Sequence, residues 1–531
     1  MIEIGYRNVR AGYMVGLRIL MGVGANLISA KAMILNPKKL GLVWVVTLLT
    51  AVPVWGVSFR PVSVPVSNIS PQDTVHPIDL WGDSKHELVV ARAKGELEIY
   101  GWEGNSLALQ QTLRIPLQKE NVTYFSFAHL SRHEKAFPVV LLSDGLYFYP
   151  RQGERFADTP QRLLERTPLS VQGEGPPLQY FDLSYDLDRD GVDEILLPEQ
   201  EGFSIFHAEE EFSFRRISIP RNPFKRTKSF QFRQQLPDDP VRVSVISGSI
   251  MYRRGVDDLV FLDANGDGLE DIVYTSILPG RKSQDVERYE IFFQKKGLTF
   301  NTTPDQVVEI PYNERAYVTF RDFNKDGRAE AFVVTSNYDI VAPRTVVRIL
   351  GGSTSRTTDS KERLKFTTKD PIGLVKLGDF NADGLEDFAC TFFSYQFASA
   401  EDIASLVAAN RVKFRLQFYL GNKQKLFGKQ PDYEYELNLS LKPESYGAYL
   451  PFYLVDDMNG DRIADLIARA DETRVAIYLS QGKLSYPRQP SFAFNVPTDA
   501  MLAFDDLNGD GKTDILITSI LKPGITVYLA P

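Results

Sequence analysis

Acidic and amide side chains recur in this chain at a spacing that suits a metal ion. In the segment 261–274, Asp263, Asn265 and Asp267 alternate with other residues, so their oxygens can converge when the backbone curls. Gly268 supplies the positive φ that a sharp turn requires, and Asp271 closes the ring of oxygens. Ca²⁺ prefers such a set of hard oxygen ligands and tolerates irregular geometry, so calcium fits this spacing better than magnesium does.

The same nine-residue pattern occurs five more times, which leaves little room for chance. The copy at 457–465 departs from it at Arg462, where the other copies have glycine. A side chain there must adopt a strained left-handed conformation, so we expect this site to be the weakest of the six. The six copies occupy residues 186–194, 263–271, 322–330, 379–387, 457–465 and 506–514.

An EF-hand shares the first half of this pattern but needs a bidentate Glu at loop position twelve and a helix on each side. No copy has Glu there, and each loop leads directly into apolar residues typical of strands. These loops are therefore predicted to connect strands. The residues at position twelve are Tyr274, Leu197, Val333, Cys390, Ala468 and Ile517.

The repeated loop resembles the FG-GAP/VCBS repeat, which is the calcium-loop blade unit of integrin-α-like β-propellers and of many bacterial secreted proteins. The resemblance covers about residues 57–531 and implies an all-β propeller of four-stranded antiparallel blades. It also implies that calcium binds to the carbonyl at loop position seven and to the side chains at positions one, three, five and nine. Those side chains belong to Asp186, Asp188, Asp190, Glu194, Asp263, Asn265, Asp267, Asp271, Asp322, Asn324, Asp326, Glu330, Asp379, Asn381, Asp383, Asp387, Asp457, Asn459, Asp461, Asp465, Asp506, Asn508, Asp510 and Asp514.

A second repeated element, an alternating strand rich in aromatic residues, follows each loop and occurs eight times. Two further units would carry decayed loops at 79–87, where Trp81 replaces Asn, and at 129–137, which retains no ligand. We therefore predict eight blades, or seven if the unit at 129–137 is an insertion. The last blade lacks an outer strand, and residues 59–66 can supply it, because Pro61 and Pro65 are tolerated on a sheet edge.

The N-terminal region predicts export. Residues 38–56 contain two lysines, an apolar run and then small residues, as in a signal peptide cleaved after Gly56. The alternative is that the run remains as a membrane anchor. Translation from Met33 would give a leader of ordinary length, so we expect an export region at 1–56 and a propeller at 57–531. The mature protein would be periplasmic, on the cell surface or extracellular.

Composition narrows the classes of partner. The net charge is −8 and no basic stripe interleaved with aromatic residues is present, which argues against nucleic acid. Cys390 is the single cysteine, so no intramolecular disulfide can form and stability must come from packing and metal. Its expected role is that of a small buried apolar residue.

The long insertions are all expected on the face opposite the calcium loops, because alternate loops of an antiparallel blade emerge on opposite faces. Residues 221–230 form a basic, aromatic stretch that could meet an anionic partner or could be a solvated linker. Residues 399–410 have the pattern of a short helix that packs its own loop. The insertions are 221–243, 275–288, 336–344 and 393–412.

No catalytic motif is readable. Residues 511–513 imitate the end of a phosphate-binding loop but lack its upstream glycine, and the five histidines form no zinc or triad spacing. The preferred interpretation is an exported, non-enzymatic propeller with up to six structural calcium ions that binds a protein or glycan on the face opposite the calcium loops. The membrane would be contacted only through an uncleaved N-terminal anchor. The alternatives are a polysaccharide-active, lyase-like enzyme and a purely structural envelope component.

Overall fold

The structure, a computed structural model, describes the chain except for residues 1, 10–11, 20–57, 119–121, 133–134, 166–175, 182, 200–201, 211, 218–257, 279–284, 312–315, 338–343, 352–360, 369–371, 394–410, 424, 441–451, 456, 470, 472 and 520–523. It divides into two units, Met1–Trp55 and Gly56–Pro531. The first contains an antiparallel hairpin of β1 (Ile2–Val9) and β2 (Gly12–Ile19). The predicted signal segment lies outside the described residues. Among those that are described, no helix has the length and apolar character needed to cross a membrane.

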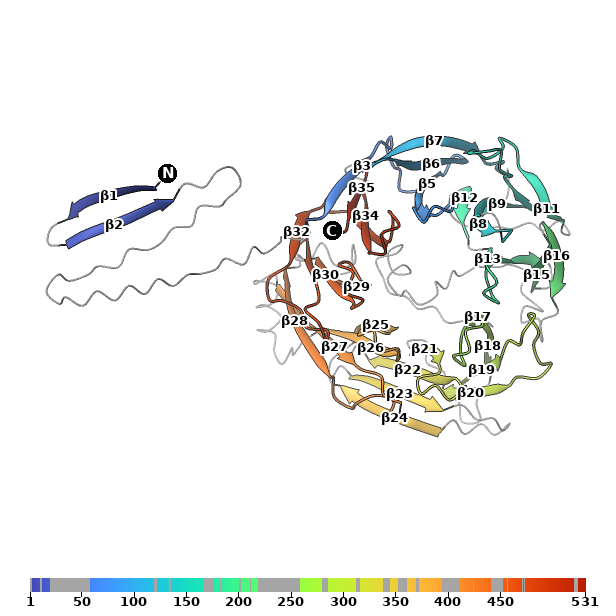
Figure 1. Cartoon of the computed structure of the whole chain (residues 1–531). Coiled ribbons are helices and arrows are strands. Elements are labelled where there is room, and N and C mark those ends of the chain that lie inside the picture. Colours follow the sequence, from blue (N-terminus) through green and yellow to red (C-terminus); the bar gives the residue numbers. More distant parts are fainter. Residues whose placement is uncertain are drawn as a thin grey trace. The chain divides into compact units, whose positions relative to one another are not determined.

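The second unit consists of eight antiparallel blades around a common centre (Figure 1). Blade 1 contains β4 (Thr74–Ile78), β5 (Glu87–Arg92), β6 (Glu96–Glu103) and β7 (Ser106–Arg114), and blade 2 contains β8 (Thr123–His129), β9 (Ala136–Leu142), β10 (Gly145–Phe148), β11 (Gln161–Glu165) and β12 (Leu178–Tyr180). Blade 3 contains β13 (Ser184–Tyr185), β14 (Glu194–Glu199), β15 (Gly202–Glu210) and β16 (Ser213–Ile217), and blade 4 contains β17 (Asp258–Leu262), β18 (Asp271–Leu278), β19 (Val286–Phe292) and β20 (Gln306–Pro311).

Blade 5 contains β21 (Ala316–Arg321), β22 (Glu330–Asn337), β23 (Arg344–Gly351) and β24 (Lys361–Thr368), and blade 6 contains β25 (Ile372–Gly378), β26 (Asp387–Phe393), β27 (Arg411–Tyr419) and β28 (Tyr433–Ser440). Blade 7 contains β29 (Phe452–Val455), β30 (Asp465–Arg469), β31 (Arg474–Tyr478) and β32 (Phe492–Asn495), and blade 8 contains β33 (Met501–Asp505), β34 (Asp514–Ser519), β35 (Gly524–Leu529) and β3 (Arg60–Val64). The predicted propeller of eight blades is therefore confirmed, and the seven-bladed alternative is wrong.

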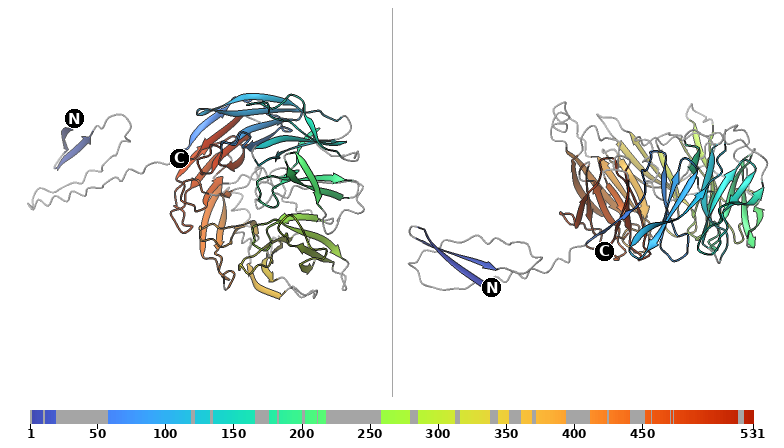
Figure 2. Two further views of the ribbon diagram at one scale, coloured as in Figure 1. Left: turned by 45° about the vertical axis from the view of Figure 1, so that its right-hand side comes forward. Right: turned by 90° about the horizontal axis from the view of Figure 1, so that it is seen from above.

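Apart from β12 in blade 2 and β3 in blade 8, the strands of each blade follow one another outward from the centre in chain order. In Figure 1, β13, β17, β21, β25 and β29 lie toward the centre, whereas β16, β20, β24 and β28 lie at the rim. Figure 2 shows the same blades from two further sides. Blade 2 has an unpredicted fifth strand, because β12 pairs in parallel with its innermost strand β8. The unit at 129–137, which could have been an insertion, contains the turn between β8 and β9 of this blade.

The eighth blade is completed by the N-terminal strand β3, as predicted. Arg60 pairs with Leu529 and Val64 with Ile525, so β3 is the outermost strand of a sheet whose other strands come from the C-terminus. Pro61 therefore lies on a sheet edge, where its missing N–H breaks no ladder between two other strands.

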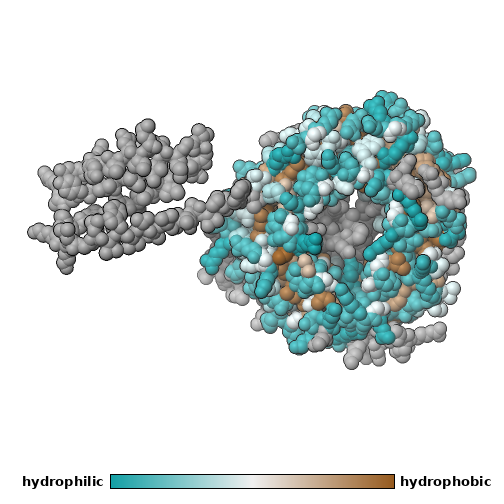
Figure 3. All heavy atoms as spheres, in the orientation of Figure 1, coloured by the Kyte–Doolittle hydropathy of each residue, from teal (hydrophilic) through white to brown (hydrophobic). Residues whose placement is uncertain are grey.

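Apolar side chains from neighbouring blades interlock between the sheets. Phe332 of blade 5 and Phe388 of blade 6 are fully buried with ring centroids 5.2 Å apart, and Phe388 stacks on Tyr419 at 4.4 Å. Cys390 is buried in the same cluster, as expected of a small apolar residue. The described part of the face in Figure 3 is mostly hydrophilic, with apolar residues in small separate groups. The core thus holds the blades in place and presents their loops at the surface.

Candidate metal centres

The six acidic loops all connect the first strand of a blade to the second, as predicted. The carboxylate at position one organises the backbone of each. In every loop the N–H of position six donates to Oδ2 of the position-one Asp, at N–O distances of 2.5–3.0 Å. In blade 4, Asp267 N–H also donates to Oδ1 of Asp263 (3.1 Å) and to Oδ1 of Asn265 (2.9 Å). The loop therefore curls so that positions one, three and five face one another.

Two residues of each loop, not one, have a positive φ. Position six is the glycine that the sequence pattern identified, and Arg462 adopts φ 66° there, as expected for the left-handed region. Position four is also left-handed, with glycine in three loops but Arg189, Lys325 and Ala382 in the others (φ 56–60°). The glycines at position four of three copies were the signal for this second turn. Strain is therefore shared among loops instead of being confined to the one with Arg462.

The carboxylate at position nine is fully buried in all six loops. One of its oxygens accepts the N–H of position two, at 2.8–3.1 Å. Burial raises the pKa of this carboxyl to about 9 in Glu194, about 8 in Asp271 and about 7 in Glu330. The same cause raises the pKa to about 7 in Asp387, Asp465 and Asp514. An ionised carboxylate here thus needs a nearby cation more than an exposed one does.

Four loops have Asp at position nine, and we call these the Asp loops (263–271, 379–387, 457–465 and 506–514). In each, the second oxygen of that Asp accepts a backbone N–H just beyond the third strand of the blade. The residue before the donor is apolar: Phe293, Leu420, Leu479 or Leu529. The donors are Gln294 (2.8 Å), Gly421 (2.7 Å), Ser480 (2.7 Å) and Ala530 (2.6 Å).

Three loops have Glu at position nine, and we call these the Glu loops (79–87, 186–194 and 322–330). In blade 5, Oε1 of Glu330 accepts from the Arg363 guanidinium at 2.9 Å, and a second nitrogen of Arg363 lies 3.7 Å from Asp326. Arg363 is the extra residue of a β-bulge in β24. Its side chain crosses Gly351, where an added Cβ would lie 2.4 Å from Arg363 Nε. A protein cation therefore already neutralises part of this loop.

Blade 1 repeats this arrangement in the loop that the sequence identified as decayed. Leu80 N–H donates to Glu87 and Gly82 N–H to Asp79, so the backbone retains the shape of the intact loops. Gln110 is the bulged residue of β7, it overlies Gly101, and its Oε1 accepts the indole N–H of Trp81 at 3.3 Å. A glycine in the third strand thus admits a side chain from the fourth strand in both blades.

The loop of blade 3 gathers the most negative charge. It alone has Asp at position three, and carboxylate oxygens of Asp186, Asp188 and Asp190 lie within 4.8 Å of one another. Oδ1 of Asp188 is buried and has no hydrogen-bond partner. An unpaired carboxylate oxygen among other carboxylates is the environment that a cation would complete, so the donor set of this loop fits a metal ion.

The donor chemistry also fits calcium in the Asp loops, where the side chains at positions one, three, five and nine all carry oxygen donors. Positions one, three, five and nine would hold the ion, which would neutralise the cluster of carboxylates. The blade 5 loop fits less well because Arg363 already contacts two of its carboxylates.

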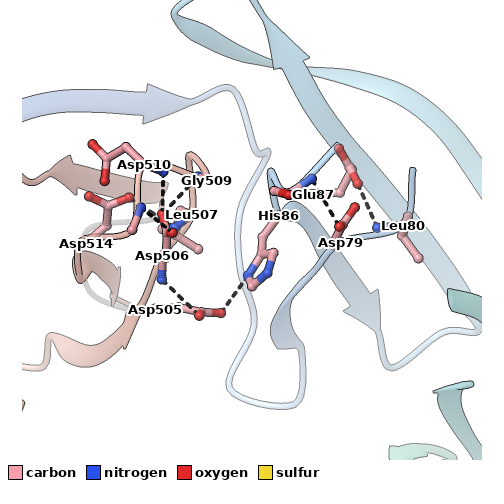
Figure 4. A network of polar contacts seen from close by, with 12 residues as sticks. Asp79, Leu80, His86, Glu87, Asp505, Asp506, Leu507, Gly509, Asp510 and Asp514 are labelled. Atoms are coloured by element: carbon pink, nitrogen blue, oxygen red, sulfur yellow. Dashed lines mark hydrogen bonds and ion pairs between the residues drawn. The ribbon is translucent and has the colours of Figure 1, made fainter. Parts of the chain in front are cut away.

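Several pairs of adjacent loops are joined by backbone hydrogen bonds. Glu270 N–H donates to Leu187 O (3.1 Å) and Ala464 N–H to Phe380 O (3.2 Å), in each case between neighbouring blades. Figure 4 shows the junction at which blade 8 meets blade 1. There His86 N–H donates to Leu507 O, and His86 Nδ1 lies 2.8 Å from Asp505, which raises the pKa of His86. The order of one loop therefore affects its neighbour.

The opposite face is less completely described. The ends of three predicted insertions belong to strands instead: β18 and β19 include 275–278 and 286–288, β22 and β23 include 336–337 and 344, and β26 and β27 include 393 and 411–412. The rest of these segments falls between second and third strands in the sequence, and 221–243 falls between β16 and β17. The stretch at 221–230 and the expected helix at 399–410 lie outside the described residues, as do most of the insertions.

Part of the chain matches a family model, and several solved structures align with the chain. Residues 457–517 match the model of the FG-GAP-like repeat. No curated protein matches the chain. Among solved structures, an Agrocybe aegerita lectin that recognises non-reducing terminal N-acetylglucosamine aligns with 14% identity over 87% of this chain and 99% of its own, with a TM-score of 0.42.

Two further structures align at lower scores. The V. cholerae biofilm matrix protein Bap1 has 10% identity over 86% of this chain and 76% of its own, with a TM-score of 0.28. A Photorhabdus luminescens Tc holotoxin pore has 12% identity over 97% of this chain but only 24% of its own, with a TM-score of 0.25. The fold supports a binding or interaction module in general. The described residues of the second unit therefore form an eight-bladed β-propeller, and the segment 457–517 of this propeller matches the FG-GAP-like repeat.

Proposed function

We propose that this protein is an exported propeller in which calcium ions hold the blade loops and a protein or glycan binds to the opposite face. The observation that carries the proposal is the six-fold recurrence of one geometry. In each loop a position-one carboxylate organises the turn, and a position-nine carboxylate is fully buried beside it.

Calcium here has a structural role. Three or four acidic side chains in one short loop repel one another, and a divalent ion offsets that repulsion while it fixes the turn between two strands. Because several neighbouring loops share backbone hydrogen bonds, ions in those loops would stiffen the belt of loops on this face at these junctions. A rigid belt on one face would position the loops that emerge on the other, where a scaffold usually presents its binding residues.

The calcium part of the proposal is tested by thermal unfolding of the full chain in EGTA and in increasing Ca²⁺. Binding to the folded state alone stabilises it by about 2.7 kcal/mol per site at a hundred-fold excess over Kd. We therefore expect a large rise in melting temperature with Ca²⁺ and a smaller one with Mg²⁺. An unchanged melting temperature would refute structural calcium.

Two variants identify where the ion binds. Asp379→Asn weakens an Asp loop and should reduce the rise in melting temperature caused by Ca²⁺. Asp158→Asn removes one carboxylate from an exposed position outside the loops and is the matched control. Equal responses of the two variants to Ca²⁺ would place the ions elsewhere.

The binding and export parts need separate measurements. Protein and glycan arrays probed with the calcium-loaded chain, and again in chelator, test for a ligand whose capture depends on the ordered propeller. Export is tested by sequencing the N-terminus of the protein recovered from the producing cell. An N-terminus at residue 57 supports a cleaved signal, and a cytoplasmic protein that begins at Met1 would contradict it.

A further inference from the structure

We propose that the blade 3 loop is a transition-metal site, of the zinc class, built from Asp188, Glu194 and His207. This inference revises the proposed function at one loop and does not require calcium to bind in the other five. Donor atoms of these three side chains lie within 4.8 Å of one another.

The three donors come from two segments that the sheet register brings together. Ile195 pairs with Phe206, so the next residues along each strand, Glu194 and His207, lie opposite each other. Nδ1 of His207 is 2.8 Å from Oε1 of Glu194, and the Glu194 side chain is fully buried while that of His207 is 15% exposed. The imidazole is therefore fixed in place beside the loop.

The hydrogen bonds of the loop show which carboxylate oxygens already have a donor and which do not. Both oxygens of Asp186 accept backbone N–H groups, and Asp190 accepts Val192 N–H and pairs with Arg132 of blade 2. Oδ1 of Asp188 is the buried oxygen without a partner. A cation bound to this oxygen would give it the partner that it lacks and would also contact Glu194 and His207.

No other acidic loop offers a nitrogen donor at this place. The equivalent third-strand residues are apolar in the Asp loops, and in blade 5 Gly351 pairs with Glu330. Position three is Asn in the five other loops and Asp only at 188. Blade 3 therefore differs from the other five acidic loops at two ligand positions, Asp188 and His207, and among the six it shares Glu at position nine only with blade 5.

This change of ligands alters the preferred metal. Calcium binds oxygen, whereas zinc accepts histidine nitrogen at about 2.0–2.1 Å together with carboxylate oxygens at about 2.0–2.2 Å. Imidazole ligands favour zinc, copper, iron and nickel in general, so Zn²⁺ should bind here even when Ca²⁺ is in excess. Two carboxylates and a neutral imidazole leave room for a water as fourth ligand.

The test is a titration of the full chain with Zn²⁺ by isothermal calorimetry in excess Ca²⁺, repeated with Co²⁺ while its visible absorption is recorded. We expect one Zn²⁺ per chain and Co²⁺ bands typical of a low-coordinate site with nitrogen. His207→Gln and Asp188→Asn should each weaken Zn²⁺ binding at least ~10-fold. Asp188→Asn restores the residue found in the other five loops, so this variant is expected to fold.

His129→Gln is the control, because His129 pairs with Asp193 of the same loop at 3.4 Å but lies outside the cluster. Zn²⁺ binding that is lost in His207→Gln and retained in His129→Gln supports the site. Absence of Zn²⁺ binding in excess Ca²⁺, or equal binding by all variants, overturns it. If Zn²⁺ binds but the melting temperature does not change with Ca²⁺, the zinc site stands and the proposed structural role of calcium is refuted.

Discussion

The Asp loops and the Glu loops have the same turn, but the carboxylate at position nine has different hydrogen-bond partners in the two groups. In the Asp loops, the buried carboxylate is short enough to accept a backbone N–H beside the third strand, as Asp387 does from Gly421. The longer Glu residues of blades 3 and 5 instead reach a side chain, His207 or Arg363. One additional methylene therefore decides whether the loop offers only oxygen donors to an ion, as in the Asp loops, or brings a nitrogen or a protein cation into it.

The largest effect expected from this comparison is on the pH dependence of stability without metal. Burial raises the pKa of position-nine carboxyls to about 7 or 8 in the Asp loops, whereas an unfolded Asp has a pKa near 3.8. Between these values the folded state holds more protons, so stability is greatest at low pH and is lost as pH rises through the folded pKa.

Unfolding in urea and EGTA between about pH 5 and 8 should therefore show falling stability as pH rises. Calcium keeps the carboxylates ionised in the folded state, so the gain from Ca²⁺ should widen over the same range. The gain would instead be constant with pH if the ions did not contact these groups.

The next effect is the loss of one buried carboxylate. Asp271→Ala leaves the N–H groups of Ala264 and Gln294 without their acceptor inside the blade, which costs about 1–3 kcal/mol for each. We expect this loss in urea unfolding even in EGTA. Asp267→Ala, at an exposed position of the same loop, is the control and should matter mainly when Ca²⁺ is present. Similar losses for both variants in EGTA would contradict the separate roles of positions five and nine.

A smaller effect on stability is expected in blade 5, where Arg363 forms an ion pair with the loop carboxylate Glu330. Gly351→Ala places a Cβ in the path of Arg363, so it should reproduce much of the loss caused by Arg363→Gln, about 1 kcal/mol for a partly exposed charged hydrogen bond. In a double-mutant cycle the two changes should be strongly non-additive. Both variants should also make blade 5 more responsive to Ca²⁺. Additive losses of stability would show that the space above Gly351 is not needed for Arg363 to reach Glu330.

The smallest effect is at Arg462. Arg462→Gly removes a side chain from a φ of 66° and should stabilise the loop by up to about 1 kcal/mol, with somewhat tighter Ca²⁺ binding. Ala382→Gly relieves a φ of 60° at position four of blade 6 and is the matched comparison. Equal gains at the two sites would mean that position six has no special importance, against the expectation that the 457–465 loop is the weakest.

The blade count and the closing strand could be predicted because both depend on local patterns. Six acidic loops and eight aromatic third strands mark every blade, and Pro61 restricts its segment to an edge. The partners of position nine could not be predicted, because they depend on strand register and on bulges at Gln110 and Arg363 that shift a side chain by one residue. The parallel strand β12 was missed for a similar reason, since three residues carry no recognisable pattern.

The pairing of β3 with β35 has a consequence for how the protein is made. Residues 60–64 leave the ribosome early, yet their partners at 525–529 are added more than four hundred residues later. Blades 1 to 7 can assemble one after another during translation, whereas the ring stays open until this last, most distant contact forms. A contact of such high sequence separation is slow to form, so closure of blade 8 is expected to be the late step of folding.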